Sequence, residues 1–453
     1  MNTWRYYIMS NMESARRGFG SPIPWMVALN VIGVNLIAPV LPAYASHFGV
    51  GFAAASTLVT VFALARMSFR LTAGSWADRH GSRIICIGGG AVQTVGALLA
   101  VFAPSLSLLL AARAIQGVGS ALFGTSINRY LLVVTRKADL GKATAGFLGG
   151  ILLGSTIGPL VGGIVAERFG IFAPFYVQAT IAALLAIVSS QYIRDVALPA
   201  RAAQGMPTQT RSFRSMLEIR GFKVIMFLGF GLFFLRAGAI SVLVPAFADV
   251  VLDMSPATIG ILISLGSITS LVAMPIAGHV ADRFGRVPVA LAGAFSTAAT
   301  VTLFGLADGA PGMMLISALL GLGIGLAAVA LPTMIGDIAP SGTEGRASAV
   351  YRMANDLGWV VGPVTLGLLA DSSRYGLAFT VAGLPLAIGG AVLGGWGQAT
   401  RKVGWRRRDS VRRRPGRPRY HLAGPPAPPR YAWSRPPGQP GPALKSDPRR
   451  RRS

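Results

Sequence analysis

The chain has 453 residues, of which 52% are hydrophobic and only 13% are charged, and its formal net charge is +26. Soluble proteins carry about 25% charged residues, so most of this chain has no water to face. The composition therefore excludes an ordinary soluble domain and indicates an integral membrane protein.

Twelve apolar stretches of about 20 residues, each long enough to cross about 30 Å of hydrocarbon, recur along the chain. They predict an all-α protein with twelve transmembrane helices, at roughly 23–46, 52–74, 84–103, 106–128, 143–166, 171–193, 222–247, 256–277, 288–307, 311–335, 347–369 and 376–397. The first stretch has features of a signal peptide, because Arg16 and Arg17 precede it and Ala43-Tyr44-Ala45 mimics a cleavage site. We expect it to be retained, since it is too long for a signal sequence and its loss would leave an odd number of spans.

The second half of the chain repeats the first at an offset of 204 residues. Segment 74–83 returns as 278–286, so that Asp78 matches Asp282 and Gly81 matches Gly285. The same offset carries Gly154, Gly158 and Pro159 onto Gly358, Gly362 and Pro363, and Gly117 and Gly119 onto Gly321 and Gly323. Two parallel repeats in an apolar chain are typical of secondary transporters, whose substrate path lies between the halves.

The repeat divides the chain into five parts. We expect an N-terminal lead (1–20), a first six-helix half (21–194), a basic linker (195–221), a second six-helix half (222–397) and a basic, proline-rich tail (398–453). The two halves should be related by pseudo-symmetry.

Positive charge is placed on one set of loops. The opposite set holds only Arg168 and Arg374, whereas the first set holds Arg79, Arg83, Arg136, Lys137, Lys142, Arg194, Arg201, Arg211, Arg214, Arg220, Lys223, Arg283, Arg286 and Arg346. Lys and Arg remain on the cytoplasmic side of membrane proteins. We therefore expect a multi-pass protein of the plasma (inner) membrane with both termini in the cytoplasm.

The tail differs in composition from the rest of the chain. Residues 399–453 hold 17 Lys and Arg against Asp409 and Asp447, among many prolines. Such a sequence cannot bury a core and is predicted to be disordered. Two interpretations stay open: a polybasic segment on anionic lipid headgroups, with each basic residue contributing about 1 kcal/mol, or a solvated tail without a role. No folded module supports nucleic-acid binding, and we expect no such partner.

Several arginines fall inside the apolar stretches. Each would cost roughly 2.5–3.5 kcal/mol if it faced lipid. Arg66 and Arg70 lie late in the second stretch and are expected to snorkel to the interface. Arg113, with Gln116 three residues on, and Arg236 lie too deep for that, so we expect them to face a watery cavity or to pair with acids, and we prefer the cavity.

The repeated loop motif Gly-x-x-Ala-Asp-Arg-x-Gly joins spans 2 and 3 and again spans 8 and 9. It presents Asp78, Arg79 and Arg83 in the first copy, and Asp282, Arg283 and Arg286 in the second. An acid-base cluster at two helix ends can serve as a latch that holds in one arrangement and breaks in another. Loop anchoring is the alternative, but two copies at one offset favour a symmetric gate.

Spans 5 and 1 carry further motifs. Span 5 combines Gly154, Gly158, Gly162 and Gly163 with Pro159 in mid-helix, a pattern that bends a helix and allows close helix packing. In span 1, segment 39–42 has two prolines that should bend the outer end of the helix. Asn30 and Asn35 are its strongly polar residues, and either could line a cavity.

Together these patterns resemble the major facilitator superfamily, and spans 4 and 5 resemble its drug:proton antiporter branch. The resemblance covers residues 21–397. Gly158-Pro159 followed by Gly162-Gly163 is similar to the antiporter motif, and Ile32-Gly33 with Pro39 and Pro42 is similar to the first-helix motif of that branch. The resemblance implies alternating access by a rocker switch, with Arg113 assisting proton coupling and Asp78 and Asp282 latching the cytoplasmic gates.

One departure concerns the proton carrier. Many antiporters of this branch carry an acid in a central helix, but span 1 here has none. The acid well inside a span is Asp356, four residues after Arg352, where the two share a helix face. An intrahelical salt bridge is one interpretation of Asp356 and proton carriage is the other.

Other chemistry finds no support. The sequence lacks the Gly-x-x-x-x-Gly-Lys-[Ser/Thr] loop of an ATP-driven pump, and its four His and one Cys form no metal-binding pattern. We therefore predict a transporter rather than an enzyme, and we expect it to need no cofactor or metal. We expect a monomer whose partners are a small-molecule substrate, protons and the lipid bilayer. Export of small amphiphilic molecules by proton antiport is the preferred function, and a proton-coupled metabolite importer is the alternative. The excess of buried arginine over buried acid favours an anionic or neutral substrate.

Overall fold

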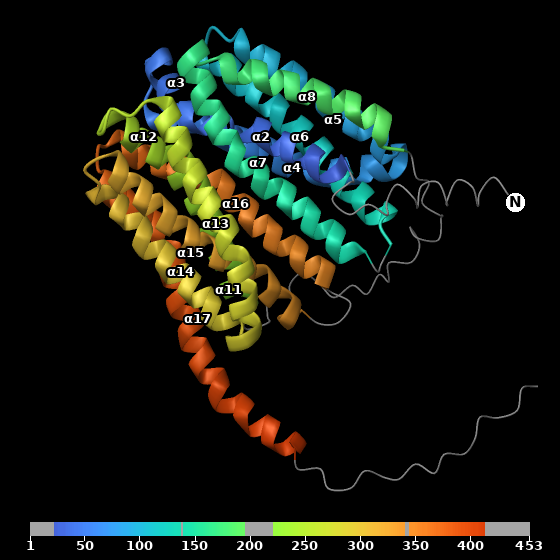
Figure 1. Cartoon of the computed structure of the whole chain (residues 1–453), viewed down its shortest axis with the longest axis vertical. Helices are drawn as coiled ribbons and strands as arrows, with labels where there is room; N and C mark the ends of the chain where they lie inside the picture. Colours follow the sequence, from blue (N-terminus) through green and yellow to red (C-terminus); the bar gives the residue numbers. More distant parts are fainter. Residues whose placement is uncertain (1–21, 137–138, 195–220, 340–343, 413–453) are drawn as a thin grey trace, which may run out of the picture. The chain divides into compact units, whose positions relative to one another are not determined.

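The computed structural model describes residues 22–136, 139–194, 221–339 and 344–412. The first part of the chain forms α2 (Pro22–Asn35), η1 (Ala38–Val40), α3 (Leu41–Phe48), α4 (Phe52–His80), α5 (Ser82–Val101), α6 (Leu106–Val134), α7 (Leu140–Phe169) and α8 (Ala173–Tyr192). The second part forms α11 (Phe222–Phe234), η2 (Leu235–Leu243), α12 (Val244–Val250), α13 (Pro256–Phe284), α14 (Arg286–Leu303), η3 (Phe304–Leu306), α15 (Ala310–Ile338), α16 (Glu344–Asp371) and α17 (Tyr375–Arg412) (Figure 1).

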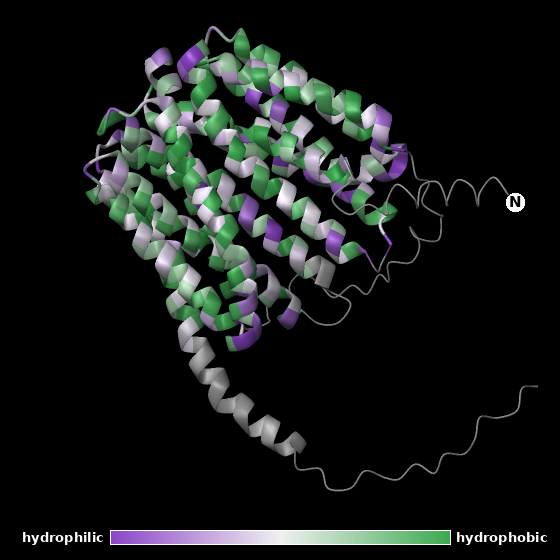
Figure 2. Cartoon of the chain, viewed as in Figure 1, coloured by the Kyte–Doolittle hydropathy of each residue, from purple (hydrophilic) through white to green (hydrophobic). Residues whose placement is uncertain are grey.

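Twelve helical segments of the described chain are long and apolar enough to span a membrane, as the sequence predicted. Their lengths run from 20 to 30 residues, so each can cross about 30 Å of hydrocarbon. Hydrophobic residues run along the helices, and hydrophilic ones gather mainly at the helix ends (Figure 2). The all-α prediction is confirmed.

Each half has its own core. One cluster of buried residues runs from Phe222 to Leu393 within the second half, and two others lie mainly within the first half. The backbone also repeats at the offset of 204 residues: Gly81 and Gly285 have φ of 85° and 91°, and Gly49 and Asp253 have φ of 63° and 49°. These values lie in the region that glycine tolerates best. Gly81 and Gly285 thus allow the same turn in both halves, whereas Asp253 adopts this conformation where the first half has Gly49.

Spans 1 and 7 are interrupted helices. In span 1, α2 ends at Asn35 and gives way to η1 and α3 around Pro39 and Pro42. In span 7, the nine-residue π-helix η2 separates α11 from α12, which has Pro245 near its start. Such π segments are frequent at functional sites, and η2 carries Arg236.

The boundary that the sequence placed before residue 398 is not a helix end. Helix α17 continues to Arg412, because segment 398–412 has neither proline nor a run of glycines and is rich in good helix formers. By their contacts, residues through Arg401 form one compact unit and those from Lys402 another. The rest of the predicted tail lies outside the described residues, as do the lead (1–20) and most of the linker.

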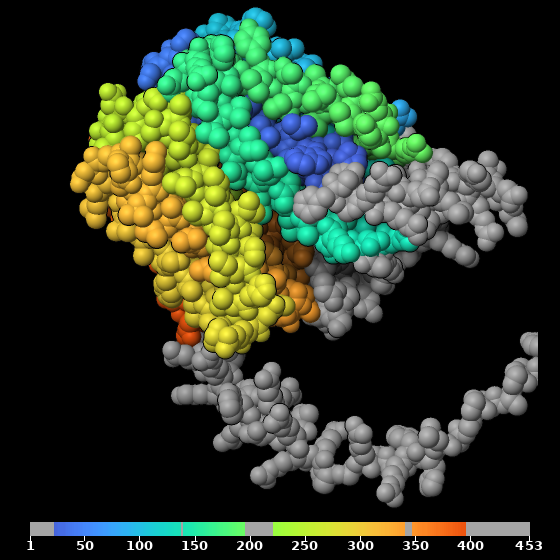
Figure 3. Space-filling view, in the orientation of Figure 1, coloured from blue at the N-terminus to red at the C-terminus, as the bar shows by residue number. Residues whose placement is uncertain are grey.

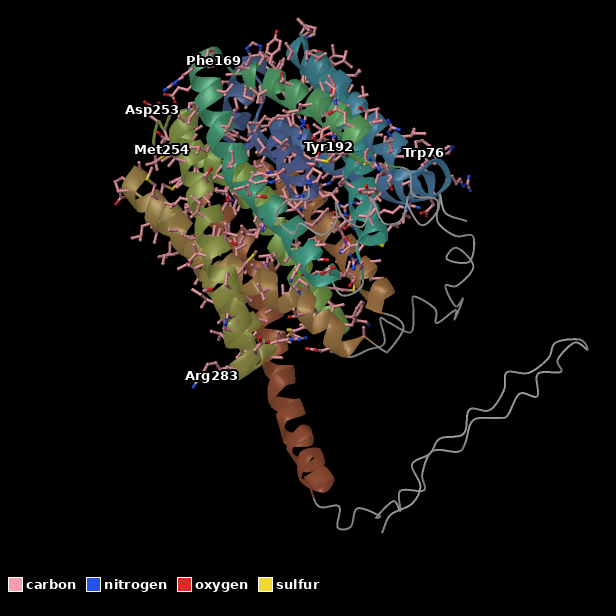
Figure 4. The ribbon with its side chains drawn as sticks, turned by 45° about the vertical axis from the view of Figure 1, so that its right-hand side comes forward. Trp76, Phe169, Tyr192, Asp253, Met254 and Arg283 are labelled. Carbon is pink, nitrogen blue, oxygen red and sulfur yellow. The ribbon has the colours of Figure 1, made fainter. Side chains whose placement is uncertain are left out.

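The membrane helices have two sides. We call the side with the loops near Gly81, Arg136 and Gly285 the linker side, and the side with loops 49–51, 170–172, 251–255 and 372–374 the far side. At the far side Phe169 of the first half lies near Asp253 and Met254 of the second, whereas Trp76 and Tyr192 lie well apart from Arg283 (Figure 4). The halves therefore meet at the far side and diverge toward the linker side, where the surface is hollowed between α7 and α13 (Figure 3).

Candidate functional site

A cavity lies where α7 of the first half meets the second half. It encloses about 520 Å³ of atom-free space, including its open mouth. Its walls comprise Leu152 and Ser155 from α7, Arg236, Ile240 and Val244 from span 7, Ile263, Gly266, Ser267 and Ser270 from α13, Phe304, and Ser317, Leu320, Gly321 and Ile324 from α15. An apolar wall with a few polar groups is the usual lining of a small-molecule site.

Arg236 supplies the charge of this cavity. It is the fifteenth of the 29 residues of span 7, close to the middle of the membrane. Its guanidinium carbon lies 5.9 Å from the centre of the Phe233 ring. Among the described residues no hydrogen bond or ion pair engages its side chain. The expectation that Arg236 faces a cavity agrees with this placement.

Arg113 has a different environment. It is buried in α6 with 3% of its surface exposed. Its Nε donates to the carbonyl of Leu58 at 3.3 Å, and its Nη1 donates to Oε1 of Gln116 at 2.6 Å. Gln116 in turn donates to the carbonyl of Gly96 at 3.0 Å, and the guanidinium carbon lies 4.4 Å from the centre of the Phe62 ring. The expectation of a watery cavity or an acidic partner is wrong for Arg113, because a carbonyl, an amide and an aromatic face replace water.

Asp356 pairs with Arg70 rather than with Arg352. Its Oδ2 lies 2.5 Å from Nη1 of Arg70, and the two side chains are 10% and 37% exposed. The intrahelical pair with Arg352 and the snorkelling of Arg70 are therefore both wrong. Helical spacing brings Arg352 within reach of Asp356 but leaves it exposed at the surface, whereas α4 of the other half lies against the inner face of α16.

Arg66 also stays inside the protein. Its guanidinium carbon lies 5.5 Å from the ring of Phe62 and 5.6 Å from the ring of Trp359 in α16. Its Nε is buried and has no hydrogen-bond partner. Snorkelling was the wrong expectation here too, since aromatic rings from both halves offer a nearer site for the cation.

The far side is closed by two acids that cap helices of the opposite half. Asp371, at the end of α16, accepts from the backbone N–H groups of Phe52 and Ala53 at the start of α4, at 2.5 and 3.0 Å. Glu167, near the end of α7, accepts from the N–H of Ala257 at the start of α13, at 3.0 Å. The first turn of a helix leaves N–H groups without partners, which carboxylates satisfy.

The two helix caps are equivalent positions of the 204-residue repeat. Glu167 and Asp371 are 204 residues apart, and so are Ala53 and Ala257. The α4 copy depends more on its acid, because its cap residue Gly51 offers no side chain, and a Cβ there would lie 2.5 Å from Oδ2 of Asp371. The two carboxylates therefore form a pseudo-symmetric pair that joins the halves. We call the contacts of Glu167 and Asp371 the far-side caps.

The span 5 motif makes two seams. An added Cβ on Gly154, Gly158 or Gly162 would meet the backbone of α2 or of Leu36, which follows it, so these residues form the close contact between spans 1 and 5. An added Cβ on Gly163 would meet the carbonyl of Pro256 in the second half. Likewise, an added Cβ on Gly260 of the second half would meet the carbonyl of Pro159. The motif thus packs its own half together and also brings the two halves into contact near the far side.

The loop motif makes contacts within each half. Oδ1 of Asp78 lies 2.5 Å from Nε of Arg129, whose Nη1 donates to Ser82 at 2.9 Å. In the second copy Arg286 pairs with Asp337 at 2.5 Å and donates to the carbonyl of Thr333 at 2.7 Å.

The other motif residues are engaged locally. Arg83 donates to the carbonyl of Ser190 at 2.8 Å, and the guanidinium of Arg283 lies over the ring of Phe284. Arg79 and Asp282 make no hydrogen bond or ion pair with the described residues. In the described chain, no hydrogen bond or ion pair of the motif residues joins the two halves.

The span 1 asparagines are engaged locally as well. Oδ1 of Asn30 accepts from Nε2 of Gln93 at 3.2 Å, and Asn35 donates to the carbonyl of Val31 in its own helix at 2.9 Å. Neither lines the cavity around Arg236. Glu167, Asp371 and Arg70 were missed by the sequence reasoning. The repeat could have revealed the first two, since both are acids at the same offset.

Comparison with known proteins gives the family. The model of the Major Facilitator Superfamily matches residues 25–255 and 226–438. Multidrug resistance protein 2 of Bacillus subtilis is 24% identical over 363 residues, which cover 79% of this chain and 90% of that protein. The multidrug efflux pump LfrA of Mycolicibacterium smegmatis is 28% identical over 395 residues, which cover 76% of this chain and 78% of that protein.

Solved structures agree in fold. A bacterial homologue of the human lysosomal transporter Spinster, in an inward-facing and occupied conformation, has a TM-score of 0.68 at 15% identity, covering 82% of this chain and 94% of that one. The nucleoside transporter NupG has a TM-score of 0.65 at 14% identity, covering 82% and 97%. With twelve membrane helices in two repeated halves, the chain belongs to the major facilitator superfamily and resembles its drug:proton antiporter branch.

Proposed function

We propose that this protein exports small amphiphilic molecules in exchange for protons, by alternating access between the two halves. The observation that carries the proposal is the apolar cavity around Arg236, near the middle of the membrane and between the halves. Secondary transporters bind their substrates at this place. The multidrug efflux pumps among its relatives support export and a broad range of substrates.

Charge supports an orientation. The linker side carries nearly all the basic loop residues, so we place it in the cytoplasm, together with both termini. The described arrangement, closed at the far side, is then open toward the cytoplasm. An exporter in this state would collect its substrate from the cytoplasm or from the inner leaflet.

Asp356 is the proposed proton carrier. Its carboxylate is buried and forms an ion pair with Arg70 across the two halves. Protonation removes the negative charge and with it the attraction to Arg70, so the proton weakens a contact between α4 and α16. A proton that enters at about −100 mV supplies about 2.3 kcal/mol, which can drive such a change.

Arg113 serves this scheme as an electrostatic neighbour. Its buried cation is held by Leu58, Gln116 and Phe62 and does not touch the cavity. A fixed positive charge in the first half opposes a second cation in the path. We therefore keep the coupling role for Arg113 and propose that it acts at a distance.

The far-side caps are the proposed outer gate. Both join the halves, and both must break if the far side is to open. The loop motifs, with Asp78 and Asp282, are proposed to form the inner gate in the opposite conformation, because in the described chain none of their hydrogen bonds or ion pairs joins the halves. The tail is proposed to contact anionic lipid, and the transporter to act as a monomer.

An importer of the same fold is the second candidate. The test is the accumulation of fluorescent cationic, neutral and anionic compounds by cells that express the full chain, with and without a protonophore. Expression should lower accumulation, the protonophore should abolish that effect, and Asp356→Asn should mimic the protonophore. Protonophore-sensitive uptake would instead establish the importer, and no flux of any compound would contradict both proposals.

A further inference from the structure

The isolation of Arg236 points to a missing anion. A cation in the middle of a membrane span is costly, and proteins keep one only where a partner or water compensates it. No carboxylate of the described residues lies within ion-pair distance of its guanidinium, in contrast to Arg70, and no carbonyl or amide accepts from it, in contrast to Arg113. The compensation must therefore come from the cavity that Arg236 lines.

The repeat explains why that cavity is open. Arg113 in the first half corresponds to Ser317 in the second, and Leu58 corresponds to Leu262, each at the offset of 204 residues. Arg113 donates to the carbonyl of Leu58, and Ser317 donates to the carbonyl of Leu262 at 2.7 Å. The same backbone carbonyl is satisfied in both halves, but by a far shorter side chain in the second.

The residues that surround Arg113 in the first half also correspond to smaller residues in the second half. Phe62, which stacks on Arg113, corresponds to Gly266, and Arg66 corresponds to Ser270. Gly266, Ser270 and Ser317 all line the cavity. Three bulky side chains that fill the first half are thus replaced by glycine and serine, and these small residues line the cavity around Arg236.

Two hydroxyl groups in the cavity wall have no hydrogen-bond partner among the described residues. The hydroxyl of Ser270 is buried and unsatisfied, and Ser155 makes no side-chain hydrogen bond with the described residues. The opposing walls are apolar, from Ile240, Ile263 and Ile324. One cation, free hydroxyl donors and apolar walls together suit a molecule with one anionic group and an apolar body.

We propose that Arg236 anchors a binding site for amphiphilic organic anions. This assignment rests on the proposed transport function and specifies its substrate class. Arg236 binds the carboxylate or sulfonate group, Ser155 and Ser270 complete its hydrogen bonds, and the isoleucines cover the apolar body. A neutral analogue loses the charge-assisted hydrogen bonds, and a cationic analogue is repelled by Arg236.

The test measures binding and needs no transport. The purified full chain in phosphatidylcholine nanodiscs is titrated with dansylglycine, a carboxylate, and with its uncharged amide, which shares the fluorophore. Charge-assisted hydrogen bonds predict that the carboxylate binds roughly tenfold or more tightly. Arg236→Gln should remove this preference and leave amide binding within roughly twofold, and Arg236→Lys should retain part of it.

A second variant restores the bulk found in the first half. Ser317→Arg should fill the cavity and abolish binding of both compounds, with size-exclusion chromatography used to check that the variant is folded. Equal binding of carboxylate and amide, binding of neither, or loss of both in Arg236→Gln would overturn the proposal. Displacement of dansylglycine by added phosphatidylglycerol would assign the anion to a lipid headgroup instead. Because the readout is equilibrium binding, failure of proton-driven export would leave it unaffected.

Discussion

Removal of the Asp371 carboxylate should open the far side. Asp371 accepts two backbone N–H groups at the start of α4, and no side chain of Gly51 can replace it. The contact joins the two halves, so it stabilises the conformation in which the far side is closed. Asp371→Ala removes it from that conformation and leaves the open one unchanged.

The size of the effect follows from helix capping. Replacement of a capping side chain by alanine costs about 0.5–2 kcal/mol, and typically about 1 kcal/mol. Asp371 is exposed, which places it in the lower part of this range. A change of about 1 kcal/mol shifts a two-state equilibrium roughly fivefold, so the population with an open far side should rise by about that factor.

Spin labels at the far side can report the change. Phe102 follows the last residue of span 3, Leu306 ends span 9, and both are exposed and equivalent in the repeat. With Cys86 replaced by Ala, labels on Phe102→Cys and Leu306→Cys give a distance distribution by pulsed electron resonance. Asp371→Ala should increase the long-distance population. The control, Asp308→Ala, removes an exposed far-side acid that makes no hydrogen bond or ion pair with the described residues, and it should leave the distribution unchanged. An unchanged distribution in Asp371→Ala, or an equal shift in both variants, would refute the outer-gate assignment.

Three further predictions concern the seam, the proton and the inner gate. Gly158→Ala places a Cβ about 2.8 Å from Cβ of Asn35 and should destabilise the protein by about 1–3 kcal/mol; Gly149→Ala, with nothing within 4 Å, is the matched control in thermal unfolding. Asp356→Asn should abolish proton-driven accumulation in vesicles but spare substrate exchange, and adding Arg70→Gln should cause little further loss; loss of exchange would mean that Asp356 binds substrate instead. Asp78→Asn should slow saturable flux and change stability by less than about 1 kcal/mol, because the carboxylate is 59% exposed; flux that does not saturate and ignores the change would indicate a channel.

The fold could be predicted because its causes are local. Apolar stretches of bilayer length define the spans, and the paired motif at Asp78 and Asp282 defines the two halves. The break in span 1 around Pro39 and Pro42 was predicted for the same reason, since proline acts within one turn. The π-helix around Arg236 was not predicted, because a wider helical turn leaves no local sequence signal.

The site was only partly predictable, because partners come from distant helices. Spacing placed Arg352 on the same helix face as Asp356, but the true partner, Arg70, is 286 residues away and belongs to the other half. An arginine in a span predicts compensation without saying by what. Arg113 donates to a backbone carbonyl and lies over an aromatic ring, whereas Arg236 lines a cavity. The repeat could have separated these two cases, since Ser317 stands where the first half has Arg113.

The most direct test of proton-driven export uses inside-out membrane vesicles that contain the full chain. A fluorescent amphiphile is offered outside, and an acid interior is imposed by a pH jump without any membrane potential. The wild type should accumulate the compound inside the vesicles in proportion to the pH difference, a protonophore should release it, and Asp356→Asn should not accumulate it. Accumulation that is independent of the pH difference, or that persists fully in Asp356→Asn, would contradict proton antiport through this residue.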